Sequence, residues 1–409
     1  MTRTPRIIPA SSSLMLAMTL LTGSAAAQTS LFEIESSAGT KLVEVGDEGG
    51  FVLKGATDAG TVPATGAGTR LMWYPRRAAL RAGFVSGTAW DDQNIGVFSM
   101  AFGANATASG MSSTALGSET TASGANSTAM GARTSASGNT STAFGLDTKA
   151  QGVFSTAMGL ATSATAGSST ALGGGTTASA DYATAMGSGT TAGGNSSTAM
   201  GVRSIASGDF STAMGFETRA SGVSSTAMGA ASTAAGLASV AMGTRANAQG
   251  VGSFAFADRS STEPFTALDN QFVVRAHGGI GFNSGTNIGC DLPAGVGAWA
   301  CTSSRLAKEG FADVDGEAVL AKLARMPIQR WSYLGTPAAH VGPFAEDFWA
   351  AFGLGEGSTT ITTVDADGIA LLGVQTLERR TAELRAENAE LLRRIEKLEA
   401  TARCASPNP

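Results

Sequence analysis

Residues 127–140 read Ser-Thr-Ala-Met-Gly-Ala-Arg-Thr-Ser-Ala-Ser-Gly-Asn-Thr, and this pattern of 14 residues returns from residue 98 to residue 257 without an insertion. Each copy places an Ala directly before a bulky apolar residue, and a second Ala row runs from Ala108 to Ala248. Self-similarity at a fixed period indicates a repeat architecture. The bulky residues are Phe102, Leu116, Met130, Phe144, Met158, Leu172, Met186, Met200, Met214, Met228, Met242 and Phe256.

Each copy contains two short segments that favour β-structure, such as residues 127–131 and 134–138, and each segment ends in a Gly that can adopt a positive φ. Stacked copies give every strand the same strand of the next coil as its neighbour, which satisfies the backbone hydrogen bonds. The sequence therefore predicts a mainly β fold, a parallel β-solenoid of 14-residue coils.

The adjacency of Ala129 and Met130 predicts an apolar outer surface. Successive side chains of a strand point to opposite faces, so if Ala129 faces into a narrow coil, Met130 faces outward. Burying a Met or Leu side chain is worth about 1.5 to 3 kcal/mol, so twelve exposed bulky residues favour a partner, and identical chains around a common axis supply one. The alternative is a monomeric solenoid with Met inside and Ala outside.

These repeats resemble the head repeats of trimeric autotransporter adhesins, whose motif is Ser-Val-Ala-Ile-Gly followed by a second Ala-x-Gly. In this chain Thr stands in place of the usual Val, and Met most often replaces Ile. The resemblance implies a left-handed parallel β-roll and a homotrimer.

The composition excludes several classes of function. Charged residues are 14% of the chain against a usual share of about 25%, and the net charge is −5. This balance gives no electrostatic basis for binding nucleic acid. With 2 His and 3 Cys, the chain offers little for a zinc site or a His-based triad. We expect no cofactor and no metal.

The N-terminus has the features of a secretory signal peptide over residues 1–27. Arg3 and Arg6 precede an apolar stretch over residues 14–21, and Ala27 ends a run of small residues at which we expect cleavage. A buried N-terminal helix is the alternative. The signal predicts a secreted or cell-surface protein, associated with the outer membrane and without a membrane helix after signal removal. In that oxidising setting Cys290 and Cys301 either pair or stay free thiols, and Cys404 has no obvious partner in its own chain.

Two flanking regions adjoin the β-roll at residues 98–257. We expect residues 28–97 to form an N-terminal β cap, in which Trp73 and Trp90 seal the solenoid or else form an exposed aromatic patch. We expect residues 258–302 to form a β neck, in which the segments 272–276 and 278–282 pair and lead into the Cys loop.

Ser303 and Lys308 are the candidate catalytic residues. A Ser can be activated by a neutral Lys whose pKa is lowered by burial, and no His is then required. Ser and Lys five positions apart also occur by chance in many surface loops, so the spacing alone is a weak signal.

The segments around residues 303–309, 339–348 and 365–370, followed by a terminal helix, resemble the endosialidase-type intramolecular chaperone domain, a self-cleaving peptidase family. Members trimerise, help an upstream β-fibre to fold, and are cut off by a Ser-Lys dyad. The resemblance implies a chaperone and peptidase domain at residues 303–373, with Ser303 as nucleophile, Lys308 as base and scission next to Ser303. Ser304 stands where Asp is commonest in the family, and His340 lies in the matching His-x-Gly segment, where we interpret it as structural.

A heptad pattern over residues 374–400 predicts a coiled coil. Leu at every d position favours dimers, whereas Leu392 at e permits three strands. The a positions are Val374, Thr381, Asn388 and Ile395, and the d positions are Leu377, Leu384, Leu391 and Leu398.

Together these features predict an exported trimeric fibre or adhesin-like surface protein, with a host-surface glycan or protein as a possible receptor. Its C-terminal domain would drive trimerisation and folding and then be removed by self-cleavage. The alternatives are a tail-spike-like enzyme that degrades extracellular polysaccharide, and a glycan- or ice-binding array on the Thr rows. No recurrent acidic pair supports glycoside hydrolysis in the repeats.

Overall fold

The structure is a computed structural model that describes residues 30–35, 41–46, 50–286 and 288–405. The signal peptide predicted at residues 1–27 lies outside the described residues. The chain divides into two compact units, one up to Cys301 and the other from Thr302 onward.

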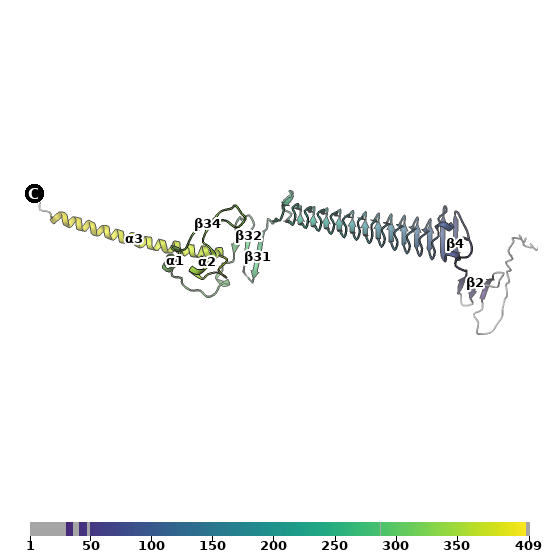
Figure 1. Cartoon of the computed structure of the whole chain (residues 1–409), viewed down its shortest axis with the longest axis horizontal. Coiled ribbons are helices and arrows are strands. Elements are labelled where there is room, and N and C mark those ends of the chain that lie inside the picture. The colour runs from purple at the N-terminus through teal and green to yellow at the C-terminus, as the bar shows by residue number, and fades with distance from the viewer. Residues whose placement is uncertain (1–29, 36–40, 47–49, 287, 406–409) are drawn as a thin grey trace, which may run out of the picture. The chain divides into compact units, whose positions relative to one another are not determined.

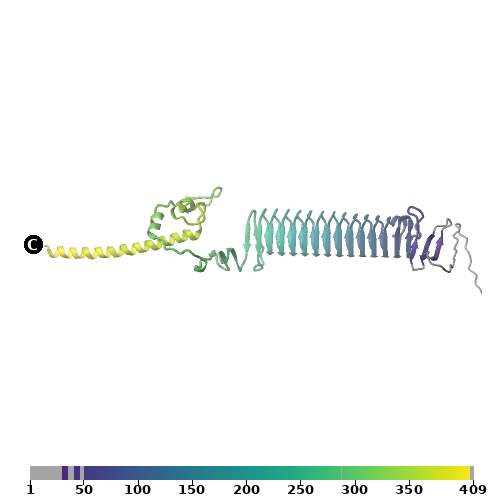
Figure 2. The ribbon, with the colours of Figure 1, turned by 90° about the horizontal axis from the view of Figure 1, so that it is seen from below.

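The first unit is dominated by a β-solenoid in which every coil contributes one long and one short strand (Figures 1 and 2). All pairs between successive coils are parallel and in register, so that Ala129 pairs with Ala143 and Met130 with Phe144. The long strands are β6 Met100–Ala104, β8 Thr114–Ser118, β10 Thr128–Ala132, β12 Thr142–Leu146, β14 Thr156–Leu160, β16 Thr170–Gly174, β18 Thr184–Ser188, β20 Thr198–Val202, β22 Thr212–Phe216, β24 Thr226–Ala230, β26 Val240–Thr244, β28 Phe254–Ala257 and β30 Phe272–Arg275.

The short strands form a second parallel sheet with the same coil-to-coil register. They are β7 Thr107–Ala108, β9 Thr121–Ala122, β11 Ser135–Ala136, β13 Lys149–Ala150, β15 Ser163–Ala164, β17 Thr177–Ala178, β19 Thr191–Ala192, β21 Ile205–Ala206, β23 Arg219–Ala220, β25 Thr233–Ala234, β27 Ala246–Ala248 and β29 Phe265–Ala267.

The interior of the solenoid consists of small side chains. Ala129 and Ala136 are fully buried, and so are their counterparts along the two Ala rows. Ser127 and Thr134 are buried beside them, so two hydroxyl rows complete the interior. Met130 is half-buried on the outer face of the long sheet. The predicted alternation, with Ala inside and the bulky residue outside, is therefore confirmed.

The bends differ from the prediction that each strand ends in a positive-φ Gly. Gly131 has a φ of +123°, but it lies within β10, whereas Gly138 lies outside the left-handed region. The residues at the two bends are Arg133 and Thr140, with φ values of 50° and 55°. A Cβ on Gly138 would overlap the carbonyl oxygen of Gly152 in the next coil, so close stacking explains this second Gly row.

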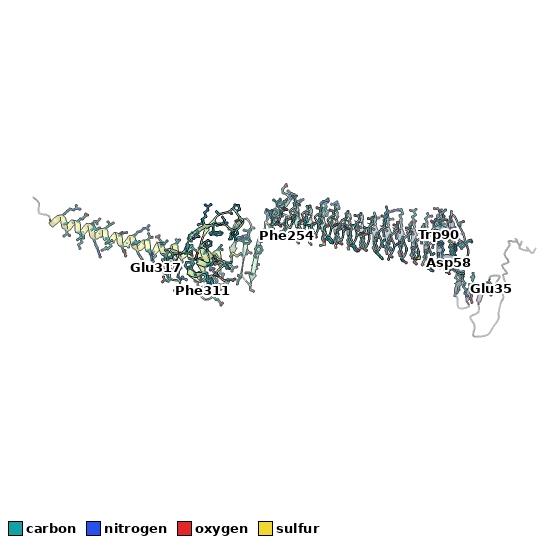
Figure 3. All side chains as sticks on the ribbon, viewed as in Figure 1. Glu35, Asp58, Trp90, Phe254, Phe311 and Glu317 are labelled. Atoms are coloured by element: carbon teal, nitrogen blue, oxygen red, sulfur yellow. A yellow bond between two sulfur atoms is a disulfide. The ribbon has the colours of Figure 1, made fainter. Side chains whose placement is uncertain are left out.

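The N-terminal end of the solenoid is sealed by a hairpin. Strands β4 Gly68–Tyr74 and β5 Ala79–Val85 pair antiparallel, and β5 adds in parallel to β6. Arg81 occupies the position of the buried Ala row, and its Nη2 donates to the carbonyl oxygen of Ala108 at 2.8 Å. Trp90 lies at this end of the solenoid (Figure 3). Its side chain is fully buried, and its Nε1 donates to the carbonyl oxygen of Ala106 at 2.7 Å.

Arg81 and Trp90 donate to the carbonyl oxygens of Ala108 and Ala106 in the first coil, so the short sheet ends at β7 without a further strand. Burial lowers the pKa of Arg81 to about 10. The sealing role predicted for the Trp residues is confirmed for Trp90. The remaining strands of this region form a small antiparallel sheet, comprising β1 Ser30–Glu35, β2 Lys41–Gly46 and β3 Phe51–Leu53.

The C-terminal end of the solenoid extends beyond the 14-residue pattern. β29 pairs with β27 and β30 pairs with β28, so one more coil follows the repeats. The predicted pairing of residues 272–276 with residues 278–282 is wrong, because β31 Gly279–Gly285 pairs with β32 Ile288–Pro293 instead. β32 also pairs with β33 Ala300–Cys301, and a disulfide joins Cys290 to Cys301.

The second unit is a small α+β body with a long C-terminal helix (Figure 1). Val319, Phe348 and Ile369 form its buried core. Thr362 and Asp365 cap the last helix, because the amide of Asp365 donates to Thr362 Oγ1 and that hydroxyl donates to the Asp365 carboxylate. The elements are α1 Gly316–Leu323, β34 Gln329–Trp331, β35 His340–Gly342, α2 Ala345–Phe352 and α3 Thr363–Ala405.

Candidate functional site

The two candidate catalytic residues lie at the start of the second unit and contact each other. Lys308 Nζ donates a hydrogen bond to Ser303 Oγ at 2.8 Å. A single 3₁₀ turn, Arg305–Ala307, separates the two residues and brings the Lys side chain back toward the Ser. A nucleophile and a base within hydrogen-bond reach are the geometric requirement for a Ser-Lys dyad.

Ser304 caps the turn that closes this contact. Its Oγ accepts a hydrogen bond from the amide of Leu306 at 3.2 Å, and its carbonyl oxygen accepts one from the amide of Ala307 at 3.1 Å. Ser and Asp are both strong N-cap residues. Ser at this position therefore supports the turn as the family's usual Asp can. Sequence reasoning missed this role, although the Ser-x-Leu spacing before a short helix is its signal.

Both dyad side chains are exposed in the single chain. A neutral Lys amine is favoured by desolvation, because burial penalises the charged form. The single chain supplies the hydrogen bond of the dyad but not this burial.

Helices α1 and α3 are fixed against each other close to the core. A Cβ on Gly316 would overlap the side chain of Thr376, so the helices meet at this Gly. Glu317 forms ion pairs with Arg379, at 2.7 Å, and with Arg380. Hydrogen bonds from Arg380 and then Arg379 lower the pKa of Glu317. These contacts attach the base of the long helix to the small body.

His340 belongs to an aromatic cluster. Its ring centroid lies 4.8 Å from that of Trp331 and 5.7 Å from that of Tyr333. Trp331 and His340 also face each other as paired residues of β34 and β35. These contacts support the structural role predicted for His340.

Two apolar rows lie exposed or half-exposed on the surface. The first is the bulky row on the outer face of the long sheet, which we call the Met row; Phe144, Met158 and Phe256 are its most exposed members. The second row runs along α3 from Val374 onward, where every apolar side chain at an a or d position is exposed. These are Val374, Leu377, Leu384, Leu391, Ile395 and Leu398.

Comparison with known families recognises both parts of the chain. Residues 303–353, which begin at the candidate nucleophile, match the chaperone of endosialidase, peptidase S74. No curated protein matches the chain. Overlapping segments match the YadA head domain repeat (2 copies), at residues 95–120, 108–134, 122–148, 136–162, 164–190, 192–218, 220–246 and 234–260.

These matches confirm both resemblances seen in the sequence. The chain combines adhesin-type head repeats with a chaperone domain of a kind that generally implies trimeric assembly. Repeats of this type indicate a surface-exposed protein.

In the described ranges, no cluster of three or more His, Cys, Asp or Glu residues could hold a metal ion. Among the described helices, none is both long and apolar enough to cross a membrane. The side chain of Cys404 lies outside the described residues.

Proposed function

We propose that this chain is an exported, homotrimeric fibre or adhesin-like surface protein whose C-terminal unit acts as a folding clamp and is then removed by self-cleavage next to Ser303. The solenoid is the durable part of the fibre. The segment from residue 303 onward assembles the chains, and its long helix forms a three-stranded coiled coil from residue 374 to residue 400. After assembly this segment is released by the cut.

The contact between Lys308 Nζ and Ser303 Oγ carries this proposal. The dyad follows directly after the boundary between the two compact units, at Cys301 and Thr302. Scission at this position releases one complete unit from the other and breaks neither the solenoid nor the α+β body.

The chemistry uses the chain's own groups. Lys308, as the neutral amine, accepts the proton of the Ser303 hydroxyl while Oγ attacks the carbonyl carbon of Thr302. The bond from that carbon to the Ser303 nitrogen breaks, and the nitrogen receives the proton. Water then hydrolyses the resulting ester, which leaves a carboxylate on Thr302 and restores the Ser hydroxyl.

Assembly supplies the condition that the single chain lacks. Packing of neighbouring chains around the exposed dyad would remove water from Lys308 and favour its neutral form. Cleavage is then coupled to completed assembly, because an isolated chain keeps its Lys in water.

A clamp solves a register problem that the repeats create. Neighbouring 14-residue coils are nearly identical, so three solenoids can align with an error of one or more whole coils. Joining the C-terminal helices first fixes the alignment at one end. Removal of the clamp afterwards leaves the assembled fibre kinetically trapped.

Expression of the full chain with Ser303→Ala or Lys308→Ala tests the proposal. We expect wild-type protein to split on a denaturing gel into two fragments, with mass spectrometry placing the new terminus beside Ser303. Each variant should stay full length. Lys308→Arg keeps the charge but cannot act as the base, so it should also stay full length.

The variant Thr302→Ser changes the residue beside the cut without removing a dyad group, and it should still be cleaved. Equal banding of Ser303→Ala and wild type would mean that another protease cuts the chain, or that nothing does.

A further inference from the structure

One bend of the solenoid carries a row of aromatic residues at regular intervals. This bend leads from each short strand into the next long strand, and its residue adopts the left-handed conformation in every coil. Phe154, Tyr182 and Phe210 occupy it in alternate coils, with φ values of 58°, 59° and 57°. The intervening coils have Ser168 and Ser196 at the same position.

Neither the backbone nor the core accounts for these rings. The left-handed region favours Gly, Asn and Asp, and the bend forms in every coil whichever residue occupies it, so an aromatic side chain adds nothing to the bend itself. Phe154, Tyr182 and Phe210 leave 64%, 68% and 63% of their surface exposed. The same row also contains Phe98, four coils before Phe154. The other members within the repeats are smaller, and they are Ser112, Asn126, Thr140, Ser168, Ser196, Ser224, Ala238 and Gly252.

Hydrogen bonds between coils fix the spacing of the rings. The amide of Tyr182 donates to the carbonyl oxygen of Gly167 at 2.9 Å, and the amide of Phe210 donates to that of Asn195 at 2.8 Å. The bend is thus a continuation of the parallel ladder. Rings in alternate coils lie about 9.6 Å apart, because neighbouring strands are about 4.8 Å apart.

Polar groups accompany the rings along the same edge. Asp181 and Asp209 each directly precede a ring, and the Oδ1 of each accepts a backbone amide hydrogen of the previous coil at 2.8 Å. Among the described residues, no hydrogen bond occupies the Oδ2 of either carboxylate. Flat apolar faces beside hydroxyl and carboxylate groups match the surface of a sugar, which has C–H faces and a rim of hydroxyl groups.

We propose that Phe154, Tyr182 and Phe210 form a binding platform for a linear, neutral, β-1,4-linked polysaccharide. Each sugar of such an extended chain advances by about the height of one coil, and successive sugars are turned over relative to each other. Every second sugar therefore presents the same face, which matches a ring in every second coil. Asp181 and Asp209 select against acidic polysaccharides by charge repulsion.

The first test removes the rings without straining the bend. The triple variant Phe154→Asn, Tyr182→Asn and Phe210→Asn installs the residue that the chain itself uses at position 126. Calorimetric titration of the purified, assembled protein with cellohexaose and with chitohexaose should show binding to at least one of them. The triple variant should bind that sugar more than about tenfold more weakly. Maltohexaose, whose α-1,4 links curve the chain, should not bind.

A matched control removes three other exposed apolar side chains from the same edge. Val223, Leu237 and Val251 hold the position preceding the bend residue in coils that have no ring there. Their replacement by Asn should leave the affinity within about twofold of wild type. Failure of both β-1,4-linked probes to bind wild-type protein, or unchanged binding by the ring-less variant, overturns the proposal.

A second test keeps three rings and changes only their spacing. The double variant Ser168→Tyr and Tyr182→Ser moves the middle ring by one coil, so two rings would meet opposite faces of adjacent sugars. Affinity for the sugar should fall more than about threefold. Equal affinity would show that the two-coil period has no role, and it would overturn the match to a β-1,4-linked chain.

The proposal requires the solenoid but not self-cleavage. Sedimentation of the ring-less variant should give the same oligomer as wild type. If the oligomer is lost, the rings belong to a contact between copies of the chain and the glycan platform is wrong. The gel pattern near residue 303 reports separately on the folding clamp.

Discussion

The solenoid and the C-terminal unit bury very different interiors. Each coil encloses rows of Ala, Ser and Thr, and its backbone hydrogen bonds run into the next coil. The C-terminal unit has a core centred on Val319, Phe348 and Ile369, and it continues into a helix whose apolar a and d positions are exposed. The solenoid is built by repetition of backbone contacts, whereas the C-terminal unit relies on a few large side chains.

Under the proposed function, this difference gives the two regions separate tasks. A ladder of identical coils is stable along its length but does not define its own alignment with a neighbour, because every coil offers the same contacts. A unit with one specific core and a heptad helix defines one alignment. In that proposal, durability and correct registration lie in different parts of the chain, with the candidate dyad at the boundary between the two compact units.

The largest expected effect comes from filling the space between coils. Gly145 has a φ of +127°, and a Cβ there would overlap the carbonyl oxygen of Gly159. Gly145→Val should lower the free energy of unfolding of the solenoid by at least about 3 kcal/mol, measured by thermal or denaturant unfolding. Gly174→Val is the control, because open space surrounds Gly174. Equal losses would mean that close stacking does not hold the coils.

The next effect concerns assembly through the Met row. Met186→Asp places a charge on the outer face of the long sheet and should weaken the oligomer by at least about 1.5 kcal/mol per chain, measured by sedimentation equilibrium. Thr177→Asp, on the short sheet, should have little effect. If Thr177→Asp weakens the oligomer more than Met186→Asp does, the contact between chains lies on the short sheet.

A smaller effect tests the cap of the dyad turn. Ser304→Ala removes the acceptor for the Leu306 amide, and a lost N-cap costs about 1 kcal/mol. Self-cleavage should therefore slow by about fivefold in a gel time course. Ser304→Asp restores the acceptor and should cleave at least as fast as wild type. If neither variant changes the rate of self-cleavage, the cap of the turn does not contribute to the reaction.

The smallest effect is a pH dependence where the repeats end. The hydroxyl of Ser260 and then the amide of His277 donate to Asp258, and they lower the pKa of this carboxyl to about 2. A depressed folded-state pKa gives stability that is present above the unfolded value and is lost as the pH falls through about 2. The hydrogen-exchange rates of residues 258–277, corrected for intrinsic exchange, should thus rise as the pH falls from 4 to 2.

Asp258→Asn is the control for this pH dependence, because the amide does not titrate. Its exchange rates over residues 258–277, corrected for intrinsic exchange, should stay constant over that interval. A matching acceleration in the variant would assign the effect to another carboxyl group.

The solenoid, its register and the direction of its side chains follow from the amino-acid sequence alone. A period of 14 residues repeated twelve times leaves one parallel alignment within the chain, and the alternation of strands then places Ala129 inside and Met130 outside. It also suggested Ser303 and Lys308 as candidate catalytic residues, through resemblance to a family and not through their spacing, and the structure shows that the two side chains are in contact. These features follow from patterns that are local and repeated.

Features that depend on residues from separate coils or elements became apparent only in the folded chain. The bends use Arg133 and Thr140 in a conformation that their residue types do not favour, because hydrogen bonds to the previous coil hold them there. Arg81 looks like a surface residue in the sequence, yet it enters the solenoid because carbonyl groups at the open end need donors. Ser304 acquires its role because a turn closes around it. The role of each of these residues depends on the groups that lie next to it in the folded chain. The repeat pattern along the sequence does not show which groups these are.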